Sequence, residues 1–286
     1  MEYGVVFPHH EIGTDASAIR EFAQGAEGLG FTHLLIYDHV LGADPDRPGG
    51  WSGPYDASVA FHEPFVTFGF LAAVTTRIEL VTAVLVVPQR QTALVAKQAA
   101  EVDLLSGERL RLGIGTGWNE VEYEALNESF HDRGKRQEEQ VDLLRKLWRE
   151  ESVTFRGKYH TVTQASINPR PKREIPIWFG GGVDAVFRRA ARLGQGWFPL
   201  MGPNDEARDA IAKIKRYLKE AGRSFDGFGI EAQAQIRGGD EDRWRRHAEK
   251  WAKLGATHIA IATQYAGLET VADHLRKAEQ YLRAIR

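Results

Sequence analysis

The stretch IWFGGGVDAVFRRAARLGQGWFP, residues 177–199, contains the unit on which the fold prediction rests. It begins with a short apolar run at 177–179 and passes through three glycines into a segment of helical period at 183–193. Gly194 then leads into a second short apolar run at 196–199. The order strand, helix, glycine, strand is typical of a βα unit in a parallel sheet.

The same order recurs along the whole chain. Strands are expected at residues 3–7, 32–37, 78–84, 110–115, 177–179, 196–199, 229–236 and 258–262. Helices are expected at residues 16–29, 62–74, 92–105, 133–149, 183–193, 205–221, 241–254 and 270–285. Several of these helices end in a Leu-Gly or Ala-Gly pair, as expected where glycine takes the left-handed cap position.

Eight such units without a break in composition favour a closed barrel over an open doubly wound sheet. The expected fold class is therefore α/β, a (β/α)8 TIM barrel, with a single domain over residues 1–286.

Two stretches interrupt the regular alternation of strands and helices. Residues 41–61 follow an expected strand, so we expect this insertion loop at the C-terminal mouth, where barrel active sites lie. Residues 151–176 follow a helix and contain a possible hairpin at 155–159, and their position is left open.

The composition is that of an ordinary globular protein, with 286 residues of which 43% are hydrophobic and 27% are charged. The net charge of -2 gives no general attraction to nucleic acid or anionic membranes, so neither is expected as a partner. The absence of cysteine excludes disulfides, thiolate metal sites and a cysteine nucleophile. The longest apolar run, 80–88, is too short for a spanning helix, and the acidic start Met1-Glu2-Tyr3 is unlike a secretory signal. A cytoplasmic location is expected.

Asp38 and His39 come directly after the second expected strand. In a barrel both side chains would emerge at the catalytic face. A histidine there can take or donate a proton near neutral pH, and the adjacent carboxylate can tune it or hold a polar edge of a ligand. His39 is therefore the candidate catalytic residue.

Two glycine-rich segments follow later strands. Residues 113–119, GIGTGWN, allow a flat ligand or a phosphate to approach the backbone, but a tight turn explains them equally well. Gly180-Gly181-Gly182 precedes a helix, and free amides at a helix N-terminus form an anion site. Arg136 is a candidate for a second phosphate contact, against the alternative of a solvated helix charge.

A metal site is not expected, because the ten histidines show no ligand spacing and no i, i+4 pair. The sequence contains no G-x-S-x-G motif, so nothing in it indicates a serine hydrolase. The tryptophans near expected strand ends or loops suit a pocket for a planar group, although core packing would explain them equally well. The candidate substrate-binding residues are His9, Trp51 and Trp197.

Five segments resemble one known family over nearly the whole chain. They are GVVFP at 4–8, LLIYDH at 34–39, VTAVLVVPQRQTALVAKQAAEVDLLSGERLRLGIGTGWNEVEYEALN at 81–127, RGKRQEEQVDLLRKLW at 133–148 and PIWFGGG at 176–182. In these segments the sequence is similar to the luciferase-like family of flavin and deazaflavin oxidoreductases, and in particular to its branch that depends on coenzyme F420. The long central segment is the most specific of the five.

The resemblance implies a (β/α)8 barrel with the deazaflavin or flavin ring across the mouth. It makes His39 the active-site histidine and Asp38 the carboxylate beside it, with a cis peptide between Ala83 and Val84 that supports the ring. It assigns Asp38, Ala83 and Val84 to contacts with the cofactor as well, with further loop contacts at Thr116, Gly117 and Trp118 and a phosphate site at Arg136, Gly180, Gly181 and Gly182.

The sequence also departs from this branch. Its sugar-phosphate dehydrogenases carry a tryptophan shortly after the Asp-His pair and a glutamate in the strand-four loop. Here those places hold residues such as Ala43 and Trp118, which disfavours a sugar phosphate and leaves the organic substrate open.

The leading functional hypothesis is an oxidoreductase that transfers a hydride between F420 and a small organic substrate. One alternative is an FMN-dependent monooxygenase supplied with reduced flavin by a separate reductase. Another is a barrel that binds flavin or F420 without catalysis. The resemblance further implies a homodimer packed through outer helices.

Overall fold

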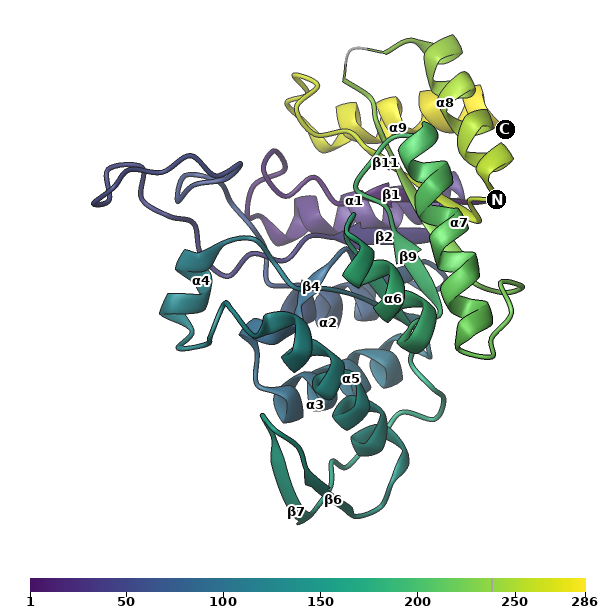
Figure 1. The fold of residues 1–286 in the computed structure, drawn as a ribbon. Helices are drawn as coiled ribbons and strands as arrows, with labels where there is room; N and C mark the ends of the chain where they lie inside the picture. The colour runs from purple at the N-terminus through teal and green to yellow at the C-terminus, as the bar shows by residue number, and fades with distance from the viewer. Residues whose placement is uncertain (238) are drawn as a thin grey trace.

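The computed structural model describes residues 1–237 and 239–286, and its parallel strands close into a barrel surrounded by helices (Figure 1). Neighbouring strands follow the order β3-β2-β1-β11-β10-β9-β8-β5-β4, and the pairing of β3 with β5 closes the ring. This is the (β/α)8 architecture predicted from the recurring strand and helix pattern.

The strand positions agree with the sequence pattern to within one or two residues in most cases. The barrel strands are β1 (Glu2–Val6), β2 (His33–Ile36), β3 (Glu79–Thr82), β4 (Leu85–Val86), β5 (Leu110–Gly115), β8 (Ile177–Gly180), β9 (Gly196–Phe198), β10 (Gly229–Gln235) and β11 (His258–Ala262). The strand expected at 78–84 is wrong in one respect, since only β3 lies within it, and a second short strand, β4, follows it. The peptide between Ala83 and Val84, which lies between the two strands, is cis, as the family resemblance implies.

The helices also follow the predicted pattern. They are α1 (Ala16–Leu29), α2 (Pro64–Val74), α3 (Thr92–Ser106), α5 (Arg133–Arg149), α6 (Asp184–Leu193), α7 (Asp205–Glu220), α8 (Glu241–Leu254) and α9 (Val271–Ile285). The short helix α4 (Glu120–Ala125) and the 3-10 turn η1 (Val87–Gln89) were not expected. Asn119 begins α4, because its side chain accepts a hydrogen bond from the amide of Val121. None of the helices in the described residues has both the length and the apolar character needed to cross a membrane.

The two insertions lie in different places. Residues 41–61 and α4 project on the same side of the barrel, at the left of Figure 1. The second insertion forms the predicted hairpin, with strands β6 (Val153–Arg156) and β7 (Thr161–Ala165), beyond α3 and α5 (Figure 1). Glu139 of α5 holds the turn by accepting hydrogen bonds from the amides of Lys158, Tyr159 and His160. The first insertion therefore belongs to the mouth, and the hairpin packs outside the ring of helices.

A buried ionic cluster occupies the end of the barrel opposite the mouth, where the parallel strands begin. Glu231 accepts a hydrogen bond from Arg111 at 3.0 Å and contacts His33 at 3.0 Å. Arg111 also contacts Glu79, and its guanidinium lies over the ring of Trp178. Buried charges require partners of this kind. This end of the barrel is therefore closed by paired charges.

Candidate functional site

His39 and Glu122 form a hydrogen-bonded pair at the mouth of the barrel. The Nδ1 atom of His39 lies 3.3 Å from each carboxylate oxygen of Glu122. Since an ionised carboxylate only accepts hydrogen bonds, the Nδ1 atom carries the proton in the neutral ring. The Nε2 atom is then left unprotonated, as a base for a ligand in the mouth.

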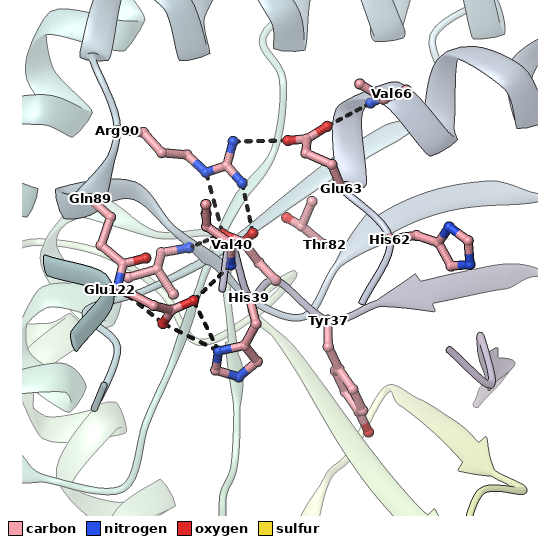
Figure 2. Close-up of polar contacts among 12 residues, drawn as sticks. Tyr37, His39, Val40, His62, Glu63, Val66, Thr82, Gln89, Arg90 and Glu122 are labelled. Carbon is pink, nitrogen blue, oxygen red and sulfur yellow. Dashed lines mark hydrogen bonds and ion pairs between the residues drawn. The ribbon is translucent and has the colours of Figure 1, made fainter. Parts of the chain in front are cut away.

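Glu122 is held in place from several sides, as Figure 2 shows. Its carboxylate accepts hydrogen bonds from the amide of Val40 at 2.7 Å and from the side chain of Gln89 at 3.3 Å. Burial alone would raise the pKa of Glu122, but the contact with His39 and the Val40 amide outweigh it and lower the pKa. Glu122 is therefore ionised at neutral pH. The sequence analysis missed it, although a carboxylate just past a predicted strand end was a usable signal.

Asp38 lies in the wall of the barrel and not beside a ligand. Its carboxylate accepts hydrogen bonds from the amide of Val86 at 2.9 Å and from the guanidinium of Arg90, at 2.7 Å for the closer nitrogen. Arg90 in turn donates to Glu63 at 2.9 Å (Figure 2). Burial lowers the pKa of Arg90, but Asp38 and Glu63 outweigh it and raise the pKa. Asp38 is thus occupied in fixing β4 and η1, a positional role that differs from the expected contact with the cofactor.

Aromatic rings from two loops enclose His39. The centres of the Tyr55, Phe61 and Trp118 rings lie 5.2, 4.7 and 5.5 Å from that of His39. The ring centre of Trp51 lies 5.9 Å from that of Trp118. The structure therefore brings Trp118 to His39 and Trp51 to Trp118, together with two residues of the 41–61 insertion that the sequence analysis did not single out. We refer to Tyr55, Phe61, Trp118 and Trp51 as the aromatic cage.

His9 and Trp197 are completely buried and do not reach the mouth, so neither can contact a substrate in this conformation. The Nε2 atom of His9 accepts a hydrogen bond from the amide of Tyr37 at 3.0 Å. Burial and the neighbouring histidines hold the pKa of His9 well below its usual range. Trp197 donates to the carbonyl oxygen of Gly181 at 2.7 Å and packs edge-on against Phe187. Both side chains support loops around the site.

Val84 occupies a cradle between two glycines at the mouth. A Cβ atom added at Gly115 would lie 2.4 Å from a methyl carbon of Val84, and one added at Gly180 would lie 2.6 Å from the other. Larger residues at either position would displace Val84. Ala83 and Val84 are themselves only partly buried, so their edge remains accessible.

The loop after β5 is shaped by a third glycine, Gly117. Gly117 has a φ of 65°, in the left-handed region that glycine tolerates best, and a Cβ there would lie 2.7 Å from Val86. The carbonyl of Thr116 accepts a hydrogen bond from the hydroxyl of Tyr123 at 2.6 Å. These contacts fix the loop that carries Trp118, whose side chain is 40% exposed.

The N-terminus of α6 has the features of an anion site. Val183, its N-cap residue, makes no side-chain capping hydrogen bond, and three glycines precede it. The nearby carboxylate of Asp184 is engaged by Arg188 and Tyr217. The amide of Gly181 itself donates to the carbonyl oxygen of Phe198 at 3.2 Å, so the anion site predicted at Gly180, Gly181 and Gly182 stays a prediction that rests on the other amides at this helix end.

Arg136 is not available to this anion site. Its guanidinium donates to the carbonyl oxygens of Pro88 at 3.1 Å and Ser129 at 2.6 Å, and it pairs with Asp132 at 2.7 Å. A further contact with Glu128 at 3.3 Å completes the set. The predicted phosphate contact is therefore corrected: Arg136 joins η1 to the loop before α5.

Comparisons with known proteins agree with this architecture. The family model described as luciferase-like monooxygenase matches residues 1–285. An uncharacterized protein of Mycobacterium tuberculosis is 36% identical over 80% of this chain and 84% of its own length. A protein of Kribbella flavida named F420-dependent glucose-6-phosphate dehydrogenase is 30% identical over 89% of this chain and 76% of its own.

Two solved structures show the same fold at low sequence identity. An F420-dependent secondary alcohol dehydrogenase in complex with an F420-acetone adduct matches with a TM-score of 0.82 and 16% identity, over 100% of this chain and 99% of its own. The monooxygenase RslO1 from Streptomyces bottropensis matches with a TM-score of 0.77 and 18% identity, over 100% of this chain and 98% of its own.

Proposed function

Since the chain belongs to the luciferase-like monooxygenase family and is an enzyme, we propose that it transfers a hydride between coenzyme F420 and a small organic substrate at the barrel mouth. The observation that carries the proposal is the His39–Glu122 pair at the mouth, in which the contact through Nδ1 leaves the Nε2 atom of His39 unprotonated. The F420-dependent relatives supply the choice of cofactor.

The residues at the mouth fit such a cofactor. The two glycines leave room for Val84, and the partly buried residues Ala83 and Val84 would support a planar ring. The uncapped N-terminus of α6 suits a phosphate group, since its amides and the helix dipole both favour negative charge. Trp118 and the Thr116–Gly117 turn would border the ring on one side.

When bound, F420 supplies two-electron hydride chemistry. The protein supplies proton transfer and orientation. The Nε2 atom of His39 accepts the proton of a substrate hydroxyl, or returns it when the substrate is a carbonyl. Glu122 keeps the ring in the required tautomer and stabilises the positive charge that His39 gains. The aromatic cage keeps water from this proton transfer.

Equilibrium titration with each cofactor tests the proposal. Oxidised F420 and FMN are added separately while tryptophan fluorescence is followed, with Trp118→Phe as the control that removes the expected reporter. We expect F420 to bind with the higher affinity and its visible absorbance to fall when a suitable alcohol is added. Micromolar binding of FMN without binding of F420, or hydroxylation that consumes oxygen, would instead support the flavin monooxygenase. Tight cofactor binding with no turnover across a broad substrate panel would favour the non-catalytic barrel.

The remaining expectations stay predictions that the same preparation can test. They are a homodimer packed through outer helices, a single domain over residues 1–286, a cytoplasmic location, and a separate reductase if the reduced cofactor is consumed. Sedimentation equilibrium reports the dimer directly.

A further inference from the structure

His10 extends the aromatic cage with a polar group that the reaction described above does not use. Its ring centre lies 4.8 Å from that of Phe61 and 5.6 Å from that of Tyr55. The same two rings contact His39. His10 and His39 therefore face one common enclosure from the loops after β1 and β2.

Tyr265, in the loop after β11, supports His10. The phenol oxygen lies 2.7 Å from the Nδ1 atom of His10, and the amide of Tyr265 donates to Glu11 at 2.7 Å. Burial, with the charges of neighbouring groups, raises the pKa of Tyr265 to about 12, so the phenol keeps its proton. Since a phenol is a strong hydrogen-bond donor, the Nδ1 atom is the acceptor and the proton of neutral His10 resides on Nε2.

The Nε2 atom of His10 is buried and has no hydrogen-bond partner within the described residues. A buried donor without a partner is costly, so such a group in a native protein calls for a functional or structural explanation, of which a bound molecule that accepts the hydrogen bond is one. The side chain as a whole is only partly buried, in contact with the cage. Its Nε2 atom is closed off in this conformation, so it can donate a hydrogen bond to a molecule that enters between the rings once they move apart.

The formal charges near the enclosure are already paired. Arg90 is held by Asp38 and Glu63, and Glu122 faces His39. Burial, followed by the charge of His39, lowers the pKa of His10, so its imidazole is neutral at physiological pH. Among the groups described above, no cation is free to pair with an anionic substrate. Burying such a substrate among the aromatic rings would therefore be unfavourable.

We propose that His10, positioned by Tyr265, is a substrate-binding residue, and that the substrate is a neutral ring compound with two oxygen functions. One is the hydroxyl or carbonyl that reacts at His39, and the other is an acceptor for the Nε2 atom of His10. The rings of the cage bind the apolar body of the molecule by stacking and edge contacts. The inference rests on the proposed function for the reaction at His39, but the binding it describes can be measured without the cofactor.

The test uses bicyclic ketones that differ by one oxygen atom. The probes are 1-tetralone and its oxa analogues 4-chromanone and isochroman-4-one, which carry the ether oxygen at two different positions. Their dissociation constants are measured by tryptophan fluorescence for the wild-type protein, His10→Phe and Tyr265→Phe. Glucose 6-phosphate serves as the anionic probe, and circular dichroism checks that each variant is folded.

We expect at least one oxa analogue to bind about 3- to 10-fold more tightly than 1-tetralone, the range of a single hydrogen bond. His10→Phe should remove this preference while leaving the affinity for 1-tetralone within about twofold, because the aromatic surface is retained. Tyr265→Phe, at a half-exposed side chain, should reduce the preference without removing it. Glucose 6-phosphate should bind more weakly than any of the ketones.

Equal affinities for all three ketones, or a preference that survives His10→Phe, would overturn the role of His10. Tighter binding of glucose 6-phosphate would overturn the neutral substrate class. Failure of the proposed function is seen separately, as the absence of F420 binding in the titration of the wild-type protein. Ketone binding that depends on His10 would then still support the recognition site.

Discussion

Replacing Glu122 by glutamine isolates the electrostatic part of the proposed proton transfer. The glutamine keeps the shape of the side chain and an oxygen that can accept the hydrogen bond of the Val40 amide, but it removes the negative charge beside His39. Two unit charges 3.3 Å apart, the distance from His39 to each Glu122 oxygen, interact by about 5 kcal/mol at an effective dielectric constant of about 20. His39 is 13% exposed, so solvent screening reduces this, and we take about 2 to 4 kcal/mol for the stabilisation of its protonated ring. At about 1.4 kcal/mol for each tenfold, Glu122→Gln should lower kcat by roughly 30- to 1,000-fold.

The assay follows the visible absorbance of F420 with the best alcohol from a substrate panel, and F420 affinity is measured in parallel. Affinity should stay within about twofold, because Glu122 acts through His39 and contacts no cofactor in this scheme. Glu124→Gln is the matched control on the same helix, since within residues 1–237 and 239–286 its exposed carboxylate has only a loose ion pair, with Arg47 at 3.8 Å. Nitrogen NMR of labelled histidine gives a readout that needs no substrate, because wild-type His39 should carry its proton on Nδ1. Wild-type kcat in Glu122→Gln, or a His39 tautomer protonated on Nε2, would refute the reasoning.

Three further predictions concern other parts of the molecule. His39→Ala should lower kcat by about 10²- to 10⁴-fold with little change in F420 affinity, and an equal loss in both would make His39 a binding residue. Gly181→Asp should weaken F420 binding more than Gly181→Ala does, because only the aspartate adds negative charge before α6. The difference between the two variants should be larger at low salt, and equal effects would place the phosphate elsewhere. Burial alone would raise the pKa of Glu231, but His33 and Arg111 lower it from 4.5 to about 2, while burial, followed by Arg111, lowers the pKa of His258 from 6.5 to about 3. Both groups bind protons more readily in the unfolded chain, so a falling pH favours unfolding. Their contribution to the free energy of unfolding is complete above pH 6.5. The contribution of His258 is lost between pH 6.5 and about 3, and that of Glu231 between pH 4.5 and about 2. Urea unfolding at a series of pH values measures this, and a flat profile from pH 7 to 3 would contradict it.

The fold was predictable because its signal is local and repeated. Runs such as 110–115 and 258–262 became β5 and β11 with the predicted bounds, since β-branched and apolar residues flanked by glycine permit little else. The helix α4 was missed because half of its six residues, EVEYEA, are charged and the segment is too short for an apolar period. The short strand β4 had no propensity signal and was not predicted, whereas the cis peptide before it, between Ala83 and Val84, was expected only from the family resemblance.

The site was predictable at strand ends and less so where partners come from distant loops. His39 and Trp118 could be selected because each follows a strand at the mouth. Arg136 was misjudged because its partners, such as the Pro88 carbonyl, are 48 residues away in sequence. Tyr55 and Phe61 lie in an insertion with no periodicity, so only the packed structure shows that their rings reach His39.

The adjacent residues Asp38 and His39 show why neighbours in a motif need not share a role. Successive side chains of an extended segment point to opposite sides, so one of the two enters the wall when the other enters the mouth. Asp38 meets Arg90 and the Val86 amide, and His39 meets Glu122 (Figure 2). The carboxylate that serves His39 is therefore supplied from α4, 83 residues away, and not by its neighbour. A rate loss in an Asp38 variant would then be an indirect effect of moving β4, and it should come with weaker cofactor binding, which Glu122→Gln should not show.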